Sequence, residues 1–226
     1  MKIKFFFASV AAGLFALNST QAQIVYDNLS TSALSGYSGL NSDKPVFGDS
    51  LTLASGGVLG SLGLSLYNSS SGGNTGSILT GSMLVNFYDN TTPYAGGVIS
   101  NPLLGSATVD FDFTADGGLG VGFYDTETFD LSAQNINLTQ NILITQQFTE
   151  LTGTSLRNGI ILFGNPTVGS SPSTVYISSA SVAPGLYTFS GNPGQFGYQV
   201  TLVPEPTTLA LASLGGIALG FFRRRK

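Results

Sequence analysis

Apolar and polar residues alternate along the middle of this chain, and this period of two is the feature that most limits its fold. Val109, Phe111 and Phe113 alternate with Asp110 and Asp112. Such alternation predicts a strand with one buried face. Strands are also expected, from the same pattern or from β-branched and aromatic content, over 24–26, 58–67, 83–88, 120–124, 141–148, 159–163, 174–178, 186–189 and 196–202.

Turn-forming residues separate these segments. Asp116-Gly117-Gly118 and Asn192-Pro193-Gly194 are two examples, and the Ser, Gly and Asn residues of 68–76 predict a loop. Many short strands at this spacing favour an all-β body, an antiparallel sandwich or jelly roll, over residues 23–202. A β-solenoid is the alternative, although no fixed repeat period supports it.

The body is acidic and sparsely charged. Charged residues make up only 9% of the chain, against about 25% in an average protein. Residues 23–202 hold two cations, Lys44 and Arg157, against eleven carboxylates, a net charge of -9. Such a body is expected to repel nucleic acid, because nucleic-acid binding needs lysine and arginine to displace counterions.

Several classes of chemistry lack their usual residues. The chain contains no cysteine and no histidine, which excludes disulfides, thiolate catalysis, cysteine-ligated metals and the commonest general base. No nucleophile elbow or phosphate-binding loop is present either. We therefore expect a protein that is not an enzyme.

The first 22 residues have the order of a secretory signal peptide. Lys2 and Lys4 precede an apolar run over 5–17, and Thr20-Gln21-Ala22 supplies a small residue at its end. Signal peptides combine a positive region, an apolar region and such a boundary. Cleavage by signal peptidase is expected after Ala22, and a buried N-terminal helix is the alternative.

The last 24 residues, 203–226, combine three elements. A Pro204-Glu205-Pro206 motif precedes an apolar run over 207–222, and a basic cluster follows it, made of Arg223, Arg224, Arg225 and Lys226. As a helix, the run would span about 24 Å, somewhat less than the roughly 30 Å hydrocarbon core of a bilayer. It predicts a single transmembrane helix with the basic cluster in the cytoplasm and the body outside. A helix packed on the body is the alternative, but the run has no polar face.

Together these elements resemble the PEP-CTERM protein-sorting domain. The resemblance rests on Val203-Pro204-Glu205-Pro206-Thr207, the apolar run and the arginine-rich end, about a tenth of the chain. It implies recognition by an exosortase, a membrane protease expected to cleave near the Pro-Glu-Pro motif. It also implies a bacterium that makes extracellular polysaccharide, often in biofilms. The C-terminal helix would then anchor the chain in the membrane only transiently.

One acidic group in the body is a candidate calcium site. Asp112, Thr114 and Asp116 precede Gly117 with the spacing of the start of an EF-hand loop. Position 12 is Phe123, where an EF-hand needs a bidentate glutamate, and the flanks are predicted strands. A strand that ends in an Asp-Gly turn is the favoured interpretation. A calcium site of another type, using Asp110, Asp112 and Asp116, is kept as an alternative, with no other metal or cofactor expected.

A second acidic group contains Asp125, Glu127 and Asp130. Paired carboxylates are the catalytic groups of glycosidases, which makes such an enzyme a third and weaker hypothesis. The second hypothesis is a carbohydrate-binding module, since some of the nine tyrosines could stack on sugars. Most are expected in the core or in cross-strand pairs.

The leading hypothesis is a non-catalytic exported protein. It would be sorted to the cell surface or the extracellular matrix, with a structural or adhesive role in a polysaccharide or biofilm layer. Its partners would be signal peptidase and exosortase, and extracellular polysaccharide is a further candidate.

Overall fold

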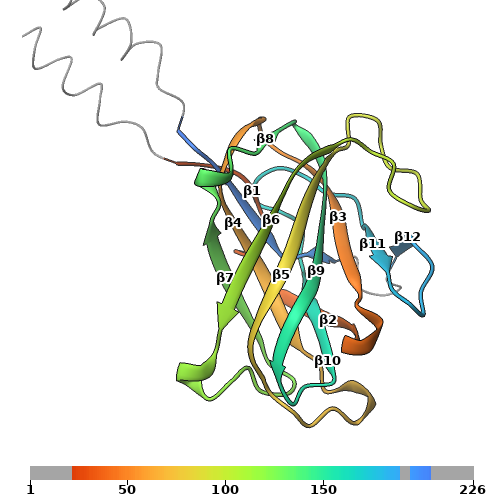
Figure 1. The fold of residues 1–226 in the computed structure, drawn as a ribbon. Coiled ribbons are helices and arrows are strands. Elements are labelled where there is room, and N and C mark those ends of the chain that lie inside the picture. Colours follow the sequence, from red (N-terminus) through yellow and green to blue (C-terminus); the bar gives the residue numbers. More distant parts are fainter. Residues whose placement is uncertain (1–21, 189–193, 205–226) are drawn as a thin grey trace, which may run out of the picture. The chain divides into compact units, whose positions relative to one another are not determined.

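The computed structural model describes residues 22–188 and 194–204. Residues Ile24–Val203 form one compact unit, built from two antiparallel sheets (Figure 1). The predicted all-β class is confirmed. The signal peptide, the transmembrane helix 207–222 and the basic cluster lie outside the described residues.

One sheet has six strands in the order β12-β11-β3-β9-β5-β6. Its strands are β3 (Val46–Thr52), β5 (Ile78–Asp89), β6 (Leu103–Asp112), β9 (Asn141–Gly153), β11 (Thr174–Ser178) and β12 (Gly185–Thr188). The pairs β3–β9, β5–β9 and β5–β6 are antiparallel over most of their length. Val109 pairs with Met83, so the two clearest alternating segments of the sequence are neighbours.

The other sheet has eight strands. They are β1 (Gln23–Asp27), β2 (Ala33–Leu40), β4 (Gly57–Asn68), β7 (Tyr124–Asp130), β8 (Asn137–Leu138), β10 (Arg157–Phe163), β13 (Gln195–Phe196) and β14 (Tyr198–Leu202). The path is β1-β14-β4-β10-β13, with β2 paired to β10 and both β7 and β8 paired to β4. The first and last strands of the body are therefore neighbours.

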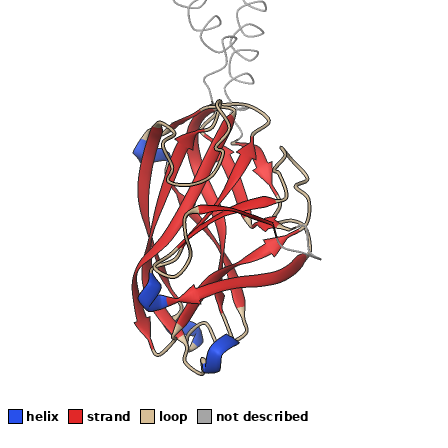
Figure 2. Ribbon diagram, turned by 90° about the vertical axis from the view of Figure 1, so that its right-hand side faces the viewer, coloured by secondary structure: helices blue, strands red, loops and turns tan. Residues whose placement is uncertain are grey.

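The single helical turns lie between strands at the ends of the body (Figure 2). They are η1 (Asn41–Asp43), η2 (Ser71–Gly73), η3 (Thr114–Asp116) and η4 (Ser132–Gln134). Among the described residues, no helix is long and apolar enough to span a membrane. The turn predicted at Asp116-Gly117-Gly118 is present, and both glycines have left-handed φ angles of 79° and 96°.

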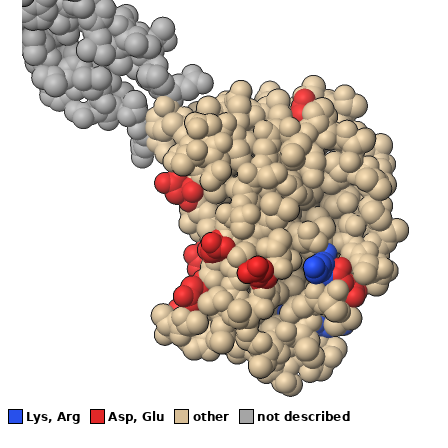
Figure 3. All heavy atoms as spheres, in the orientation of Figure 1, with Lys and Arg blue, Asp and Glu red and all other residues tan. Residues whose placement is uncertain are grey.

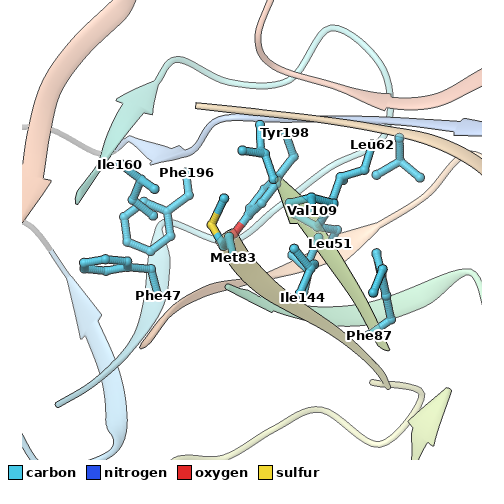
Figure 4. Close-up of a cluster of buried hydrophobic side chains, with 14 of the residues drawn as sticks. Phe47, Leu51, Leu62, Met83, Phe87, Val109, Ile144, Ile160, Phe196 and Tyr198 are labelled. Carbon is cyan, nitrogen blue, oxygen red and sulfur yellow. The ribbon is translucent and has the colours of Figure 1, made fainter. Parts of the chain in front are cut away.

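The two sheets enclose one apolar core. Phe196 and Tyr198 project into it from the eight-stranded sheet, and Phe47, Met83 and Ile144 project into it from the other (Figure 4). Phe47 and Phe196 meet across the sheets edge to face, with ring centroids 6.0 Å apart. Alternating inward side chains from two packed sheets are the arrangement of a β-sandwich, and no β-solenoid is formed.

One predicted strand is wrong. Residues 120–124 turn instead of extending, because Gly122 takes a left-handed φ of 84° and its N–H donates to the carbonyl of Asn68. The strand begins at Tyr124 and continues through Asp130. Three further strands were not predicted: β2 and β3, whose polar and glycine residues weaken the alternation, and the two-residue β8.

Candidate functional site

The described chain ends at the first residue of the sorting motif. β14 ends at Leu202, and the N–H of Val203 donates to the Val58 carbonyl over 2.8 Å. Pro204 is the last described residue, and Glu205 and Pro206 lie outside. At the other terminus, Ala22 is exposed and β1 begins at Gln23. The cleavage site after Ala22 stays a prediction.

The carboxylates proposed for calcium have local partners. Asp110 accepts a hydrogen bond from the Ser82 hydroxyl (2.6 Å). Asp112 accepts bonds from both the N–H and the hydroxyl of Thr114 (2.8 and 2.6 Å), which lower the pKa of its carboxyl. Asp116 is exposed in η3. Within the described ranges, no three His, Cys, Asp or Glu side chains form a group that could hold a metal ion.

The second acidic group lies on the edge strand β7. Asp125 and Glu127 are opposite Leu66 and Leu64 of β4, so both point toward the core side of the sheet at its margin. Partial burial and the neighbouring Asp125 raise the pKa of Glu127. Asp130 points to the opposite face and is exposed. Figure 3 shows most of the acidic side chains of this view on the side of the body where β6 and β7 lie, while one lies at the top and one at the right beside a basic side chain.

The tyrosines are mostly structural, as predicted. Tyr26 and Tyr198 are fully buried, and Tyr94 and Tyr176 pack edge to face with centroids 5.6 Å apart. Of the nine, only Tyr124 is classed as exposed, at 45%. The sequence analysis left a few of the nine tyrosines as candidates for stacking on sugars. Tyr124 is the best candidate by exposure, and its neighbour Phe123 is also exposed.

A buried carboxylate is a feature that sequence reasoning missed. Asp49 of β3 is fully buried and faces the core between Phe47 and Leu51. Its two oxygens accept bonds from the Ser171 hydroxyl (3.0 Å) and the Phe196 N–H (3.2 Å). Burial raises the pKa of the Asp49 carboxyl well above its ordinary value, more than these hydrogen bonds lower it. The sequence held one signal for this feature: in a strand, Asp49 lies on the same face as the apolar Phe47 and Leu51.

Other polar groups lie in the same core. Gln146 is opposite Phe47 on one side and Val85 on the other, so its amide also faces inward. Neither amide atom of Gln146 has a hydrogen-bond partner among the described residues, and the same holds for the hydroxyl of Tyr198. Buried polar groups without partners are costly and rare, so this core departs from an ordinary apolar sandwich.

A second missed feature is an asparagine network at one end of the body. The Asn68 amide donates to the carbonyls of Gly76 (2.9 Å) and Leu119 (2.7 Å). Its oxygen accepts bonds from Asn74 (2.8 Å) and from the Ser155 hydroxyl (2.9 Å). Segments from three different loops are thereby joined through buried side chains. The Gly- and Ser-rich stretch predicted as a loop is anchored at both of its asparagines.

A pocket of about 220 Å³ lies beside this network. Lys44 and Glu150 line it together with Phe148 and Asn158. Lys44 takes a left-handed φ of 45°, which is uncommon for a residue with a side chain. The Asn158 amide donates to Asn41 (2.7 Å), while its buried oxygen has no partner among the described residues. The pocket thus combines an ammonium, a carboxylate and amides, and Phe148 lines it as a core side chain that is only 4% exposed.

The comparisons with known proteins concern mainly the C-terminus. No curated protein matches the chain. Among solved structures, the flagellar cap protein FliD D1-D2-D3 domains from Escherichia coli align with 11% identity over 95% of this chain and 68% of that one. The TM-score of 0.15 is too low to support any argument about fold or function.

The family model for the PEP-CTERM protein-sorting motif matches residues 202–226. These residues include the Pro-Glu-Pro motif, the apolar run and the basic cluster that the sequence singled out. This chain is therefore an exported protein that carries the PEP-CTERM protein-sorting motif, the signal by which an exosortase sorts its substrates.

Proposed function

We propose that the body is a non-catalytic structural or adhesive component of a polysaccharide layer. The observation that carries the proposal is the PEP-CTERM motif at residues 202–226. In this proposal the signal peptide directs export, the C-terminal helix holds the chain in the membrane with its body outside, and the exosortase then releases it. The final location is the cell surface or the surrounding matrix.

The body supports this role by its construction. Two extensively paired sheets around one core make a rigid module without disulfides. Its low charge and many Ser, Thr and Asn side chains give a surface that can hydrogen bond to neutral polymers. The excess of carboxylates disfavours nucleic acid as a partner.

Mass spectrometry of the mature protein from the medium and from the cell envelope tests the sorting part. We expect an N-terminus at Gln23 and loss of Arg223 to Lys226. An intact basic cluster in the mature form would refute processing of the tail.

Binding of the purified mature protein to the extracellular polysaccharide of its own cells, compared with an unrelated neutral polysaccharide, tests the adhesive part. Equal or absent binding would remove it.

A carbohydrate-binding module is the second candidate, and the pocket lined by Lys44, Phe148, Glu150 and Asn158 favours it. Ammonium, carboxylate and amide groups can bond to sugar hydroxyls. Calorimetry with neutral oligosaccharides should then show binding that Lys44→Ala weakens and that Asn137→Ala, a change at an exposed residue of β8 outside the pocket, does not. Absence of binding by the wild type would sink this candidate.

Calcium assistance is tested separately. Because the Asp112 carboxylate is already bonded to Thr114, we expect the same melting temperature in EDTA and in millimolar calcium. A rise in melting temperature with calcium that Asp112→Asn abolishes would instead support a metal site at Asp110, Asp112 and Asp116.

A glycosidase based on Asp125 and Glu127 is the weakest candidate. It would need hydrolysis of a glycoside that Glu127→Gln abolishes.

A further inference from the structure

The segment that precedes the sorting motif is part of the sheet interior. β14 lies between β1 and β4 in the eight-stranded sheet, so both of its edges are paired. Leu202 is opposite Leu59 and is only 5% exposed. The hydrogen bond from Val203 to the Val58 carbonyl extends this pairing one residue further. The motif begins at the next residue, Pro204, so no free spacer separates the body from it.

The end of β14 is also closely packed. A side-chain carbon at Gly60 would lie 3.0 Å from the Val203 nitrogen, and one at Gly57 would lie 3.0 Å from the Leu202 side chain. Both contacts are tighter than ordinary van der Waals contact. The glycines of β4 thus let the chain approach closely just before the motif, and residues up to Val203 cannot shift without disturbing β4.

Access for a protease follows from this packing. A peptide that is recognised in an extended form pairs its backbone N–H and C=O groups with the binding protein. The backbone groups of β14 are already used on both edges by β1 and β4. Pro204 has no N–H to offer, and the motif holds two prolines. A protease that needs residues on the N-terminal side of the motif cannot take them from the folded sheet.

We propose that β14 is a fold-dependent gate on the sorting motif: the exosortase can act near Pro204 only when the end of β14 has left the sheet or has not yet joined it. The proposal rests on the sorting function proposed above. It makes tail removal sensitive to the local stability of the β14 end, so that the fold of the body controls the timing of release.

A linker insertion gives the most direct test, made in the full chain and in cells that carry the exosortase. A Gly-Ser linker of about ten residues between Val203 and Pro204 adds a mean reach of roughly 17 Å and leaves β14 intact. The tail-bearing fraction is followed over time by pulse labelling and mass spectrometry. We expect several-fold faster tail removal. The same linker between Gly97 and Val98, at a loop position where Val98 is 79% exposed and the Tyr94–Gly97 hydrogen bond is kept, is the matched control and should leave the rate unchanged.

A pair of point variants tests the gate without altering the motif. Leu59 and Leu66 are both fully buried on β4, but only Leu59 is opposite Leu202. Leu59→Ala should speed tail removal several-fold more than Leu66→Ala. Equal acceleration by the two would show that global unfolding, and not the end of β14, controls cleavage, and would overturn the gate.

The outcomes separate the two proposals. If no variant and no wild-type chain loses its tail, the sorting function itself fails. If the wild type and the linker variant at Val203 lose their tails at the same rate, sorting stands and the gate is overturned. Should Leu59→Ala fail to accumulate, the linker comparison still decides, because it leaves every residue of the sheet in place.

Discussion

Asp49 shows how much one residue can depend on its surroundings. Its carboxyl is buried in the core. Burial raises the pKa of the Tyr26 and Tyr198 hydroxyls, and the nearby negative charge of Asp49 raises it further. The body has only two cations, and no ion pair with Asp49 compensates its charge within the described part of the chain. Burial therefore favours the protonated form of this side chain.

Asp49→Asn should change how stability depends on pH. Because burial raises the folded-state pKa of Asp49, its stabilising contribution is complete below the ordinary carboxyl pKa of about 4. That contribution is lost as pH rises through the folded-state pKa. The free energy of unfolding, measured in urea for wild type and Asp49→Asn, gives this contribution as wild type minus variant. This difference should become smaller as pH rises from about 4 through the folded-state pKa of Asp49.

The comparison with the variant removes other carboxylates from the result. Asp112, for example, has a lowered pKa and contributes in the opposite sense, with its stabilisation lost as pH falls. This contribution is common to both proteins and cancels in the difference. A difference that does not vary with pH would contradict a buried, proton-binding Asp49.

Tyr198→Phe should stabilise the protein. The Tyr198 hydroxyl is buried and has no hydrogen-bond partner among the described residues, and such a group costs roughly 1 to 3 kcal/mol. Its removal should raise the free energy of unfolding by about 1 kcal/mol. Tyr94→Phe is the matched control, since the Tyr94 hydroxyl donates to the Gly97 carbonyl and its loss should destabilise. Chemical denaturation of both variants measures whether the free energy of unfolding rises for Tyr198→Phe and falls for Tyr94→Phe.

At the scale of elements, the loops matter as much as the strands. The predicted strands at 83–88 and 174–178 are present, because alternation reports directly which side chains a sheet buries. β3 escaped prediction because Asp49 occupies the inward position between Phe47 and Leu51, and β2 because its serines and glycines leave few apolar residues to alternate. The asparagine network could not be foreseen, since its members come from loops that only the fold brings together.

Asn68→Ala should loosen the end of the body that holds this network. The change removes two donated bonds and leaves the Gly76 carbonyl without its donor, while the Leu119 carbonyl keeps only the longer bond from the Ile78 N–H (3.2 Å). We expect a loss of roughly 2 to 4 kcal/mol in the free energy of unfolding, because a buried network fails as a unit. Faster amide hydrogen exchange should accompany it over 69–77 and 118–123.

Asn137→Ala is the control for this prediction. Asn137 is exposed on the short strand β8, so its replacement should change stability by no more than about 0.5 kcal/mol. Equal effects of the two substitutions would show that the Asn68 network does not hold the loops.

At the scale of the whole molecule, the last strand completes the fold. β14 joins β1 to β4, and it brings the buried side chains of Tyr198, Val200 and Leu202 into the core. Contacts between chain ends are slow to form because they close the longest loops. The body can therefore finish folding only after almost the entire chain has been exported.

Truncations test this dependence on the last strand. A chain that ends at Val203 should unfold cooperatively, because it retains β14. A chain that ends at Gly197 should lack a cooperative transition, because the core then loses three buried side chains and β1 loses its neighbour. Circular dichroism during thermal unfolding distinguishes the two, and cooperative unfolding of the shorter chain would contradict a central role for β14.

The sequence by itself determined the all-β class and the C-terminal sorting motif. Both depend on local order along the chain: the alternation of apolar residues with polar ones, and the succession of motif, apolar run and basic cluster. The tertiary structure alone decided that Asp49 is buried, that Asn68 joins three loops and that β14 lies between β1 and β4. These facts depend on contacts between residues far apart in the chain, for which a local pattern carries no information.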